Sequence, residues 1–179
     1  MICKDKAQLD KQKAIARLRK SLKNDYYLEH REWPYKDIKR KIIAEQYMED
    51  SETHELRDYK FFCFDGEPKV MFVASDRQSE NEETKFDFFD MEYSHLDVKN
   101  GHDNSVNLPA KPYSFEEMKN LARTLSKDLA HVRVDFYEVN KHIYFGEMTF
   151  FHFSGLVPFE PEEWDYKFGE WLKLQIANQ

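Results

Sequence analysis

The sequence predicts an α+β domain in which helices pack against an antiparallel sheet. Two observations indicate the sheet: residues 131–150 alternate apolar and polar side chains around a short turn, and residues 58–74 flank Asp65-Gly66 with two apolar runs. A third observation indicates the helices, because residues 114–130 repeat apolar side chains at helical spacing. At 179 residues, a single domain over residues 1–179 is the expected organisation.

The segment 131–156 is the densest run of aromatic and β-branched residues, and it is predicted as a hairpin with its turn at residues 140–142. A two-residue turn would put Asp135 and Glu147 on opposite faces, whereas a three-residue loop with a bulge shifts the pairing by one residue. We favour the three-residue loop because it separates the apolar face cleanly from the polar face. The pairs in this register are Val139 with Ile143, Asp135 with Glu147, and Arg133 with Thr149.

Two carboxylates that stand opposite each other destabilise a sheet unless their charge is offset. A divalent metal would offset it, because Mg²⁺ takes oxygen ligands from Asp and Glu together with waters and phosphate oxygens. Arg133, beside Asp135 and Glu147, could hold a phosphate. The alternative is a solvated face with an Arg–Asp ion pair, and the spacing alone leaves both interpretations open.

The prediction of a hairpin at residues 58–74 depends on its turn, because Asp-Gly between two apolar runs is a strong signal for a two-residue hairpin loop. Lys60 is the only cation within its first predicted strand, at residues 59–64. From the residues alone, Lys60 is equally an ordinary surface lysine at the start of a strand.

The N-terminal part of the chain is predicted to begin with a helix over residues 4–23, with Asp10 as a plausible N-cap. Residues 26–41 contain a Trp-Pro step and mixed charge, which favours an irregular connection. Residues 42–48 form a short apolar run that ends in polar residues, and we interpret them as a buried strand that leads into a hinge.

The rest of the chain alternates between loop and helix. The segment 75–112 is long, polar and weakly patterned, with a small aromatic-acidic cluster at residues 87–93, and residues 92–112 are predicted as loop. Residues 114–130 are the best helix, with Ser114 and Glu117 as a capping box. Residues 164–174 indicate a terminal amphipathic helix.

Composition narrows the classes of function. The formal net charge of −7 disfavours general binding to nucleic acid or to an acidic membrane. A mean hydropathy of −0.83, the lack of a membrane-spanning apolar run and a start unlike a signal peptide predict a soluble, cytoplasmic protein. Cys3 and Cys63 have no metal-type spacing and are expected to be reduced thiols.

Three stretches carry a resemblance to one family. RVDFY, a short turn and IYFGEMTF resemble the last two strands of an ATP-grasp catalytic domain, and REWPYKDIKRKIIAEQY and DYKFFCFDGEPK fit the same family. Nearly the whole chain is similar to the TupA-like ATP-grasp proteins of bacterial surface-polysaccharide gene clusters, named for teichuronopeptide synthesis. The resemblance implies an ATP-grasp-like α+β fold that corresponds to the C-terminal portion of the catalytic domain. The family's glycine-rich phosphate-covering loop would precede residue 4, so the fold is expected to be N-terminally incomplete.

The resemblance also implies ATP and Mg²⁺ as cofactors and assigns roles to residues. Asp135 and Glu147 would hold Mg²⁺, with Thr149 as a weaker ligand. Arg133 and Lys60 would stabilise the phosphate and an acyl phosphate. The backbone that would pair with adenine is that of Glu45, Gln46, Tyr47 and Met48.

The activity implied by the resemblance is that of an ATP-dependent carboxylate–amine ligase in cell-surface polysaccharide biosynthesis. Its carboxylate substrate would be a group such as a uronic-acid glycan precursor, and an oligomeric state is left open. Two departures from the family pattern stand out: Glu147-Met148-Thr149 replaces the usual Glu-x-Asn, and Phe151-His152-Phe153 replaces a Thr-Pro loop.

Two other classes of function remain open. A glycosyltransferase of the same gene clusters would need an Asp-x-Asp metal motif, and the sequence contains no such triplet. A non-catalytic remnant or binding module would be consistent with the missing glycine-rich loop. With that loop missing, the chain alone is expected to bind nucleotide weakly and not to turn over.

Overall fold

The computed structural model describes residues 2–75 and 83–174. Contacts divide the chain into two compact units, one ending at Met48 and one beginning at Glu49, and each is described by itself. The expectation of a single domain over residues 1–179 stays a prediction. No helix within the two described ranges is long and apolar enough to cross a membrane.

The first unit is helical. It contains the α-helices α1 (Lys11–Lys23) and α2 (Tyr26–His30) and the 3-10 turns η1 (Lys6–Gln8) and η2 (Trp33–Tyr35). Asp10 caps α1 as predicted, because its carboxylate accepts from the backbone N–H of Lys13 at 3.0 Å. The helix starts later than the predicted residue 4, since the chain before Asp10 forms the separate turn η1.

The prediction of a buried strand at residues 42–48 is wrong. These residues have no regular secondary structure, and Ile42 and Ile43 are 49% and 79% exposed. A strand depends on a neighbour that pairs with its backbone N–H and C=O groups. No strand of the described chain pairs with this segment, so its apolar sequence alone does not fix its conformation.

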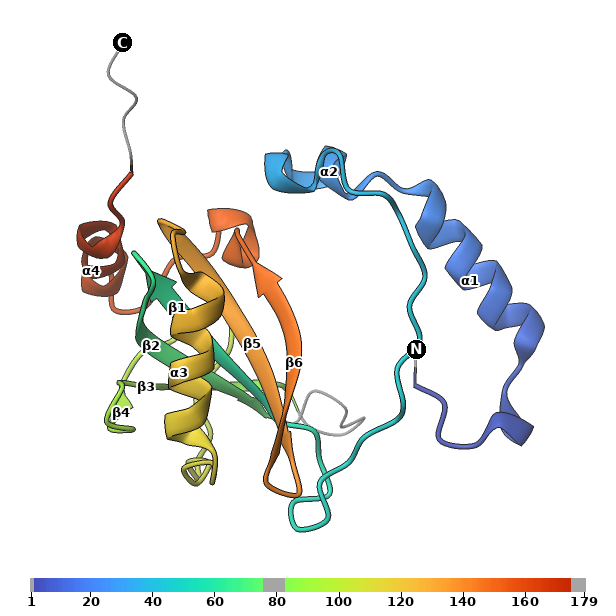
Figure 1. The fold of residues 1–179 in the computed structure, drawn as a ribbon, viewed down its shortest axis with the longest axis horizontal. Coiled ribbons are helices and arrows are strands. Elements are labelled where there is room, and N and C mark those ends of the chain that lie inside the picture. Colours follow the sequence, from blue (N-terminus) through green and yellow to red (C-terminus); the bar gives the residue numbers. More distant parts are fainter. Residues whose placement is uncertain (1, 76–82, 175–179) are drawn as a thin grey trace. The chain divides into compact units, whose positions relative to one another are not determined.

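The second unit is built on an antiparallel sheet, drawn in Figure 1. Over residues 49–75 and 83–174, the sheet has six strands in the order β4-β3-β2-β1-β5-β6. The strands are β1 (Asp58–Phe64), β2 (Glu67–Ser75), β3 (Lys85–Phe89), β4 (His95–Leu96), β5 (His131–Val139) and β6 (His142–Thr149). The α+β class with an antiparallel sheet is therefore confirmed.

The sheet has two differently covered faces. Helix α3 (Phe115–Ser126) lies across one face, as Figure 1 shows, and packs on a buried cluster with Phe61, Val134 and Phe136. Met148 and Phe150 pack against this cluster, as the predicted apolar face required. Helix α4 (Glu163–Trp171) contributes Phe168 and Trp171 to the cluster on the opposite face, around Phe62 and Phe72.

The β1–β2 hairpin confirms the predicted turn. Asp65 and Gly66 have φ values of 52° and 78°, as expected for the two central residues of a type I′ turn. The pairing then runs from Phe64 opposite Glu67 to Asp58 opposite Ala74, with one irregularity between Phe62 and Cys63.

The β5–β6 hairpin reaches the predicted polar face by a different route. The loop has two residues, Asn140 and Lys141, both with positive φ, so Val139 pairs with His142 and the predicted three-residue loop is wrong. The extra residue lies instead within β6, between Phe136–Phe145 and Val134–Met148. The pairs that frame this bulge are Phe136 with Phe145, Val134 with Met148, and Arg133 with Thr149, the last as predicted.

Gly146 makes this bulge sterically possible. A Cβ at this position would lie 3.0 Å from the carbonyl oxygen of Asp135 and 3.2 Å from the ring of Tyr137. The strand therefore approaches β5 closely where Glu147 turns onto the face that carries Asp135.

Helix α3 lies within the predicted residues 114–130, but its cap differs. The hydroxyl of Ser114 makes no capping bond and instead donates to the carbonyl of Lys141 at 3.3 Å. The carboxylate of Glu138 accepts from the backbone N–H groups of Tyr113 and Ser114 at 3.0 and 2.8 Å. The predicted capping box is wrong because a side chain from β5 supplies the acceptor.

The predicted loop at residues 92–112 contains the short strand β4, and strand β3 precedes it within the weakly patterned segment 75–112. Residues 76–82 lie outside the described part of the chain. Phe86 and Phe88 pack in the cluster beneath α4, while Asp87 is fully buried between them. Asp87 accepts hydrogen bonds from the backbone N–H and the hydroxyl of Ser105. The polar–apolar alternation of a strand is present at residues 85–88, but it spans only four residues.

Candidate functional site

A cluster of charged side chains occupies the sheet face opposite α3. Lys60 on β1 pairs in register with Asp135 on β5, and Arg133 on β5 pairs with Thr149 on β6. Because side chains alternate between faces along a strand, Lys60, Asp135 and Arg133 project to the same side, away from Tyr59 and Phe136. The bulge adds Glu147 to this group.

Asp135 is the centre of the cluster. It is 1% exposed, and its carboxylate lies between two cations. Arg133 donates two hydrogen bonds to it, from Nε to Oδ1 and from Nη2 to Oδ2, both at 2.8 Å. Lys60 donates to the same Oδ2 and also lies 3.4 Å from the carboxylate of Asp58. Buried charges of this kind are stable only when they are paired and hydrogen-bonded.

Lys60 is held in an unusual environment for a lysine. Burial lowers the pKa of its ammonium group, while the negative charge of Asp135 opposes that decrease and Arg133 adds to it. The direction that results is a lowered pKa, so burial outweighs the attraction of the carboxylate. A lysine in this setting is a buried cation rather than the surface residue that its position at a strand start would suggest.

Three oxygen atoms converge on one nitrogen of Arg133. Its Nη2 lies 2.8 Å from Asp135 Oδ2, 2.9 Å from Thr149 Oγ1 and 3.3 Å from Glu147 Oε1. The structure therefore brings together the predicted metal ligands Asp135, Glu147 and Thr149, and the atom between them is a guanidinium nitrogen. The Glu147 side chain is 64% exposed, so the cluster is open to solvent on that side.

The oxygen set fits Mg²⁺ in chemistry. Mg²⁺ is commonly held by one or two carboxylates, with waters and phosphate oxygens completing its shell, and Asp135, Glu147 and Thr149 supply such oxygens around a point of positive charge. The described residues contain no group of three His, Cys, Asp or Glu side chains that could hold a metal alone. Arg133 Nη2 occupies the point between these oxygens, so an ion that binds at that point would require Nη2 to withdraw.

His152 contacts Arg133 but was not among the predicted site residues. It belongs to the 3-10 turn η3 (His152–Gly155), and its Nδ1 accepts from Arg133 Nη1, while its Nε2 lies 2.7 Å from Asn100 Oδ1. Burial, followed by the charges of Arg133, Lys60 and His131, lowers the pKa of His152 to about 2. Sequence reasoning missed His152 and Asn100 because a lone His between two Phe residues carries no spacing signal.

The predicted adenine-binding residues lie in the other compact unit. Glu45 and Gln46 are exposed, and Tyr47 and Met48 are half-buried, in chain without regular structure. Lys4 lies over the Tyr47 ring, with its Nζ 4.9 Å from the ring centroid.

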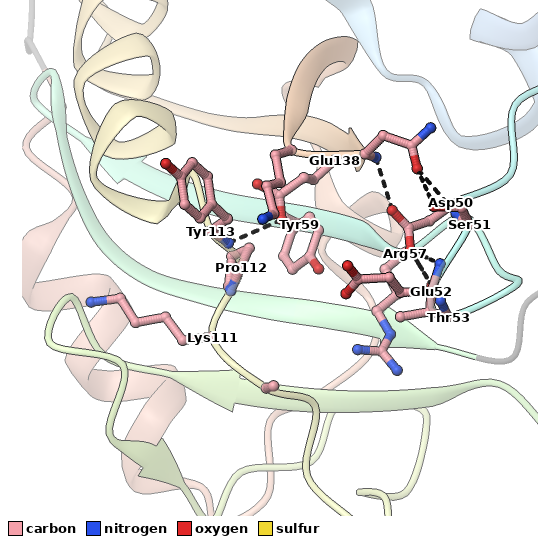
Figure 2. Close-up of a pocket in the computed structure, with 13 residues that line it drawn as sticks. Asp50, Ser51, Glu52, Thr53, Arg57, Tyr59, Lys111, Pro112, Tyr113 and Glu138 are labelled. Atoms are coloured by element: carbon pink, nitrogen blue, oxygen red, sulfur yellow. Dashed lines mark hydrogen bonds between the residues drawn. The ribbon is translucent and has the colours of Figure 1, made fainter.

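A hollow of about 550 Å³ opens near the β5–β6 turn and shares no lining residue with the charged cluster. Figure 2 shows it between residues 50–53, residues 110–113 and the end of β5, with Tyr59 and Glu138 at its wall. Tyr59 and Glu138 belong to the α3 side of the sheet, opposite Lys60 and Asp135 in the alternation of β1 and β5. Burial is the main cause that raises the pKa of Tyr59 to about 12.

The wall of this hollow is fixed by the β5–β6 turn. Asp50 accepts from the backbone N–H of Asn140 at 2.8 Å, and Ser51 donates its hydroxyl to Asn140 Oδ1 at 2.6 Å. Hydrogen bonds from backbone N–H groups, that of Asn140 first, lower the pKa of Asp50. In these contacts the polar groups of the wall bond to one another, which indicates a structural role for them.

Comparison with known proteins gives one family. The model of the TupA-like ATPgrasp family matches residues 1–173. No curated protein and no solved structure matches the chain.

Proposed function

Because this chain belongs to the TupA-like ATPgrasp family, we propose that it takes part in the ATP-dependent ligation of a carboxylate to an amine. The observation that carries the proposal is the buried carboxylate of Asp135, held between Lys60 and Arg133 beside the exposed Glu147. Two cations and two carboxylates on one face of a sheet provide opposite charges for a phosphate and for the metal ion that accompanies it.

The proposed reaction has two steps. A carboxylate oxygen of the substrate attacks the γ-phosphorus of ATP, the bond from that phosphorus to the β,γ-bridging oxygen breaks, and ADP leaves an acyl phosphate behind. An amine then attacks the acyl carbon, phosphate departs with the bonding electrons, and the amine loses a proton as the amide forms. Both steps move negative charge onto phosphate oxygens, so positioned cations lower their barriers.

Lys60 and Arg133 are the cations of the charged cluster. Arg133 can present Nη2 to a phosphate oxygen once it gives up its contacts with Glu147 and Thr149, which are with a largely exposed side chain and a neutral hydroxyl. Its hydrogen bond from Nε to Asp135 Oδ1 would keep the guanidinium next to Asp135. Asp135, Glu147 and Thr149 would hold Mg²⁺, which when bound offsets the charge of the phosphate oxygens.

The backbone from Glu45 to Met48 is proposed to bind adenine. Its support is the family match over residues 1–173 and the exposure of Glu45 and Gln46 in unpaired chain, which leaves main-chain donors and acceptors accessible to a purine edge. The acceptor is proposed to be a carboxylate-bearing glycan precursor such as a uronic acid, in cell-surface polysaccharide biosynthesis. The use of ATP is the reason to propose the cytoplasm as the compartment of this reaction.

One titration tests the proposal. The ¹⁵N-labelled chain is titrated with a non-hydrolysable ATP analogue, with and without Mg²⁺, beside the double variant Asp135→Asn, Glu147→Gln. The expected result is Mg²⁺-dependent binding that the double variant weakens by more than about 100-fold, the upper end of what loss of a residue supporting a metal site costs. Amide shifts are expected at residues 45–48 as well as around the charged cluster.

The matched control removes two carboxylates that pair with lysines at the surface, Asp103→Asn and Glu116→Gln. This control variant should bind the analogue like the parent chain. Equal binding by all three proteins, or amide shifts that gather at residues 86–93 rather than at 45–48, would contradict the assigned sites. Phosphate release from ATP in the presence of a uronic acid and an amine is expected to stay near background for the chain alone, and release that requires all three would overturn that expectation.

A further inference from the structure

A line of hydrogen bonds runs from the chain after η3 to the guanidinium of Arg133. The side-chain amide of Asn100 donates to the carbonyl oxygens of Val157 and Pro158, both at 3.0 Å. Its Oδ1 lies 2.7 Å from Nε2 of His152, and Nδ1 of His152 meets Nη1 of Arg133. Asn100 is 1% exposed, so this line lies inside the protein.

The chemistry of the groups assigns a donor and an acceptor to each bond in this line. Two carbonyl acceptors fix the nitrogen of the Asn100 amide, which leaves its oxygen facing His152. An oxygen acceptor requires that Nε2 of His152 carries the proton, and Nδ1 is then an acceptor. A guanidinium can only donate, so Arg133 Nη1 is the group that Nδ1 can accept from.

Aromatic rings hold His152 in this orientation. The ring centroids of Phe62, Phe72 and Phe153 lie 5.1, 5.5 and 4.4 Å from the imidazole centroid. A second proton, on Nδ1, would point at the Arg133 guanidinium in this apolar surrounding. The neutral imidazole is therefore the form that fits, and it offers a single acceptor in a fixed place.

This acceptor matters once Arg133 engages a ligand. In the structure Arg133 is held by Asp135 through Nε and Nη2, by Glu147 and Thr149 through Nη2, and by His152 through Nη1. If Nη2 turns to a phosphate, Nε on Asp135 and Nη1 on His152 remain. Together with the covalent bond to Cδ, these two contacts restrict the plane of the guanidinium, whereas the Asp135 contact alone leaves it free to tilt. Preorganised donors bind more tightly than mobile ones.

We propose that His152, oriented by Asn100, is a positioning residue that fixes the guanidinium plane of Arg133 for phosphate recognition. The inference rests on the proposed function for its ligand, but the geometric part stands on the hydrogen bonds alone. His152 is the central residue of Phe151-His152-Phe153, which follows Thr149 and Phe150.

Two amide substitutions separate the two ends of the imidazole. In His152→Asn the side-chain oxygen takes the place of Nδ1 and can still accept from Arg133. In His152→Gln the terminal nitrogen takes the place of Nε2, so the bond to Asn100 is kept and the acceptor for Arg133 is lost. A residue that only fills space would respond alike to both changes.

The measurement is the NMR signal of the Arg133 Nε–H group, together with affinity for the ATP analogue in Mg²⁺. We expect the His152→Asn signal to stay near that of the parent chain, and the His152→Gln signal to broaden or move toward that of a free arginine. Affinity should drop about tenfold or more only in His152→Gln, as expected for loss of a hydrogen bond to a charged group. The same two substitutions at His142, an exposed residue at the start of β6, are the control and should change neither readout.

Each measurement has a result that would overturn the proposal. ¹⁵N shifts of the unmodified chain must show His152 with its proton on Nε2, and a proton on Nδ1 would overturn the proposal without any variant. Equal Arg133 signals in His152→Asn and His152→Gln would also overturn it. If the parent chain binds no nucleotide, the proposed function fails, while the Arg133 signal still decides whether His152 positions the guanidinium.

Discussion

At the scale of single residues, Asp135 determines how the charged face is built. Its two oxygens accept from Arg133, and one of them also accepts from Lys60, in a place that is 1% exposed. Removal of one partner from a buried ion pair leaves an uncompensated charge, which costs several kcal/mol. The cluster can therefore admit a ligand only by exchange of one cation contact for another, and the contact of Arg133 with the exposed Glu147 is the easiest to exchange.

His152 makes the stability of the fold depend on pH. Its pKa is lowered to about 2 by burial and then by Arg133, Lys60 and His131, from an ordinary value of 6.5. Between these two values the unfolded chain binds a proton at this residue and the folded chain does not. The free energy of unfolding therefore falls as pH decreases below 6.5, by at most about 1.4 kcal/mol per pH unit from this residue.

We expect His152→Asn to flatten this dependence. Urea denaturation at pH 6.5, 5.5 and 4.5 should show a smaller decrease in the free energy of unfolding for the variant than for the parent chain, because Asn takes up no proton. The variant His142→Asn controls for the general effect of a lost histidine. A parallel pH profile for His152→Asn and the parent would show that His152 is protonated in the folded state.

The sequence could predict part of the site at this scale. Alternation along β5 places Arg133 and Asp135 on one face, and the resemblance points to Lys60 and Glu147 in the same group. It could not predict that Arg133 occupies the point between the carboxylates, because that depends on side-chain packing across three strands. His152 and Asn100 were equally out of reach, since they are 52 residues apart and meet only in the fold.

At the scale of elements, local signals were predictable and long-range ones were not. Asp65-Gly66 fixes its hairpin through two neighbouring residues, and Asp10 caps α1 through the next turn. The segment 42–48 was predicted as a strand and is not one, whereas strand β3 was not predicted, because a strand exists only where a neighbour pairs with it. The cap of α3 was also non-local, since Glu138 of β5 provides it.

The bulge in β6 is the element on which the site depends most. Without it, a two-residue turn at Asn140-Lys141 would leave Asp135 and Glu147 on opposite faces of the sheet. Gly146→Ala would place a methyl group 3.0 Å from the backbone of Asp135. Since backbone cannot move as freely as a side chain, we expect destabilisation of about 1–3 kcal/mol.

Gly169 in α4 is the matched control for this change, because a Cβ there meets no atom within 4 Å. Gly169→Ala should be neutral or stabilise by up to about 1 kcal/mol, since alanine favours the helix. Urea denaturation of both variants gives the two free energies. A Gly146→Ala variant as stable as the parent would mean that the bulge can shift its register, and that Glu147 is not fixed beside Asp135.

At the scale of the whole molecule, the core lies in one part of the chain. Both buried clusters draw all their members from residues 59–171. Among the described residues of the first unit, only Ala14 and Glu32 are buried. Apolar burial supplies most of the favourable free energy of folding, so the second unit contains nearly all of that contribution.

A chain that begins at Glu49 is therefore expected to fold by itself. It should unfold in urea in one cooperative transition, with the near-ultraviolet circular dichroism that its packed Phe, Tyr and Trp residues give the full chain. It would also keep the contacts of Lys60, Arg133 and Asp135, all of which lie within this unit. The full-length chain is the control for both signals. A shortened chain that binds ANS and loses its near-ultraviolet signal while it keeps its far-ultraviolet spectrum would be a loosely packed state. That result would mean that residues 2–48 are needed to complete the core, as expected if residues 1–179 fold as the single domain that their length suggests.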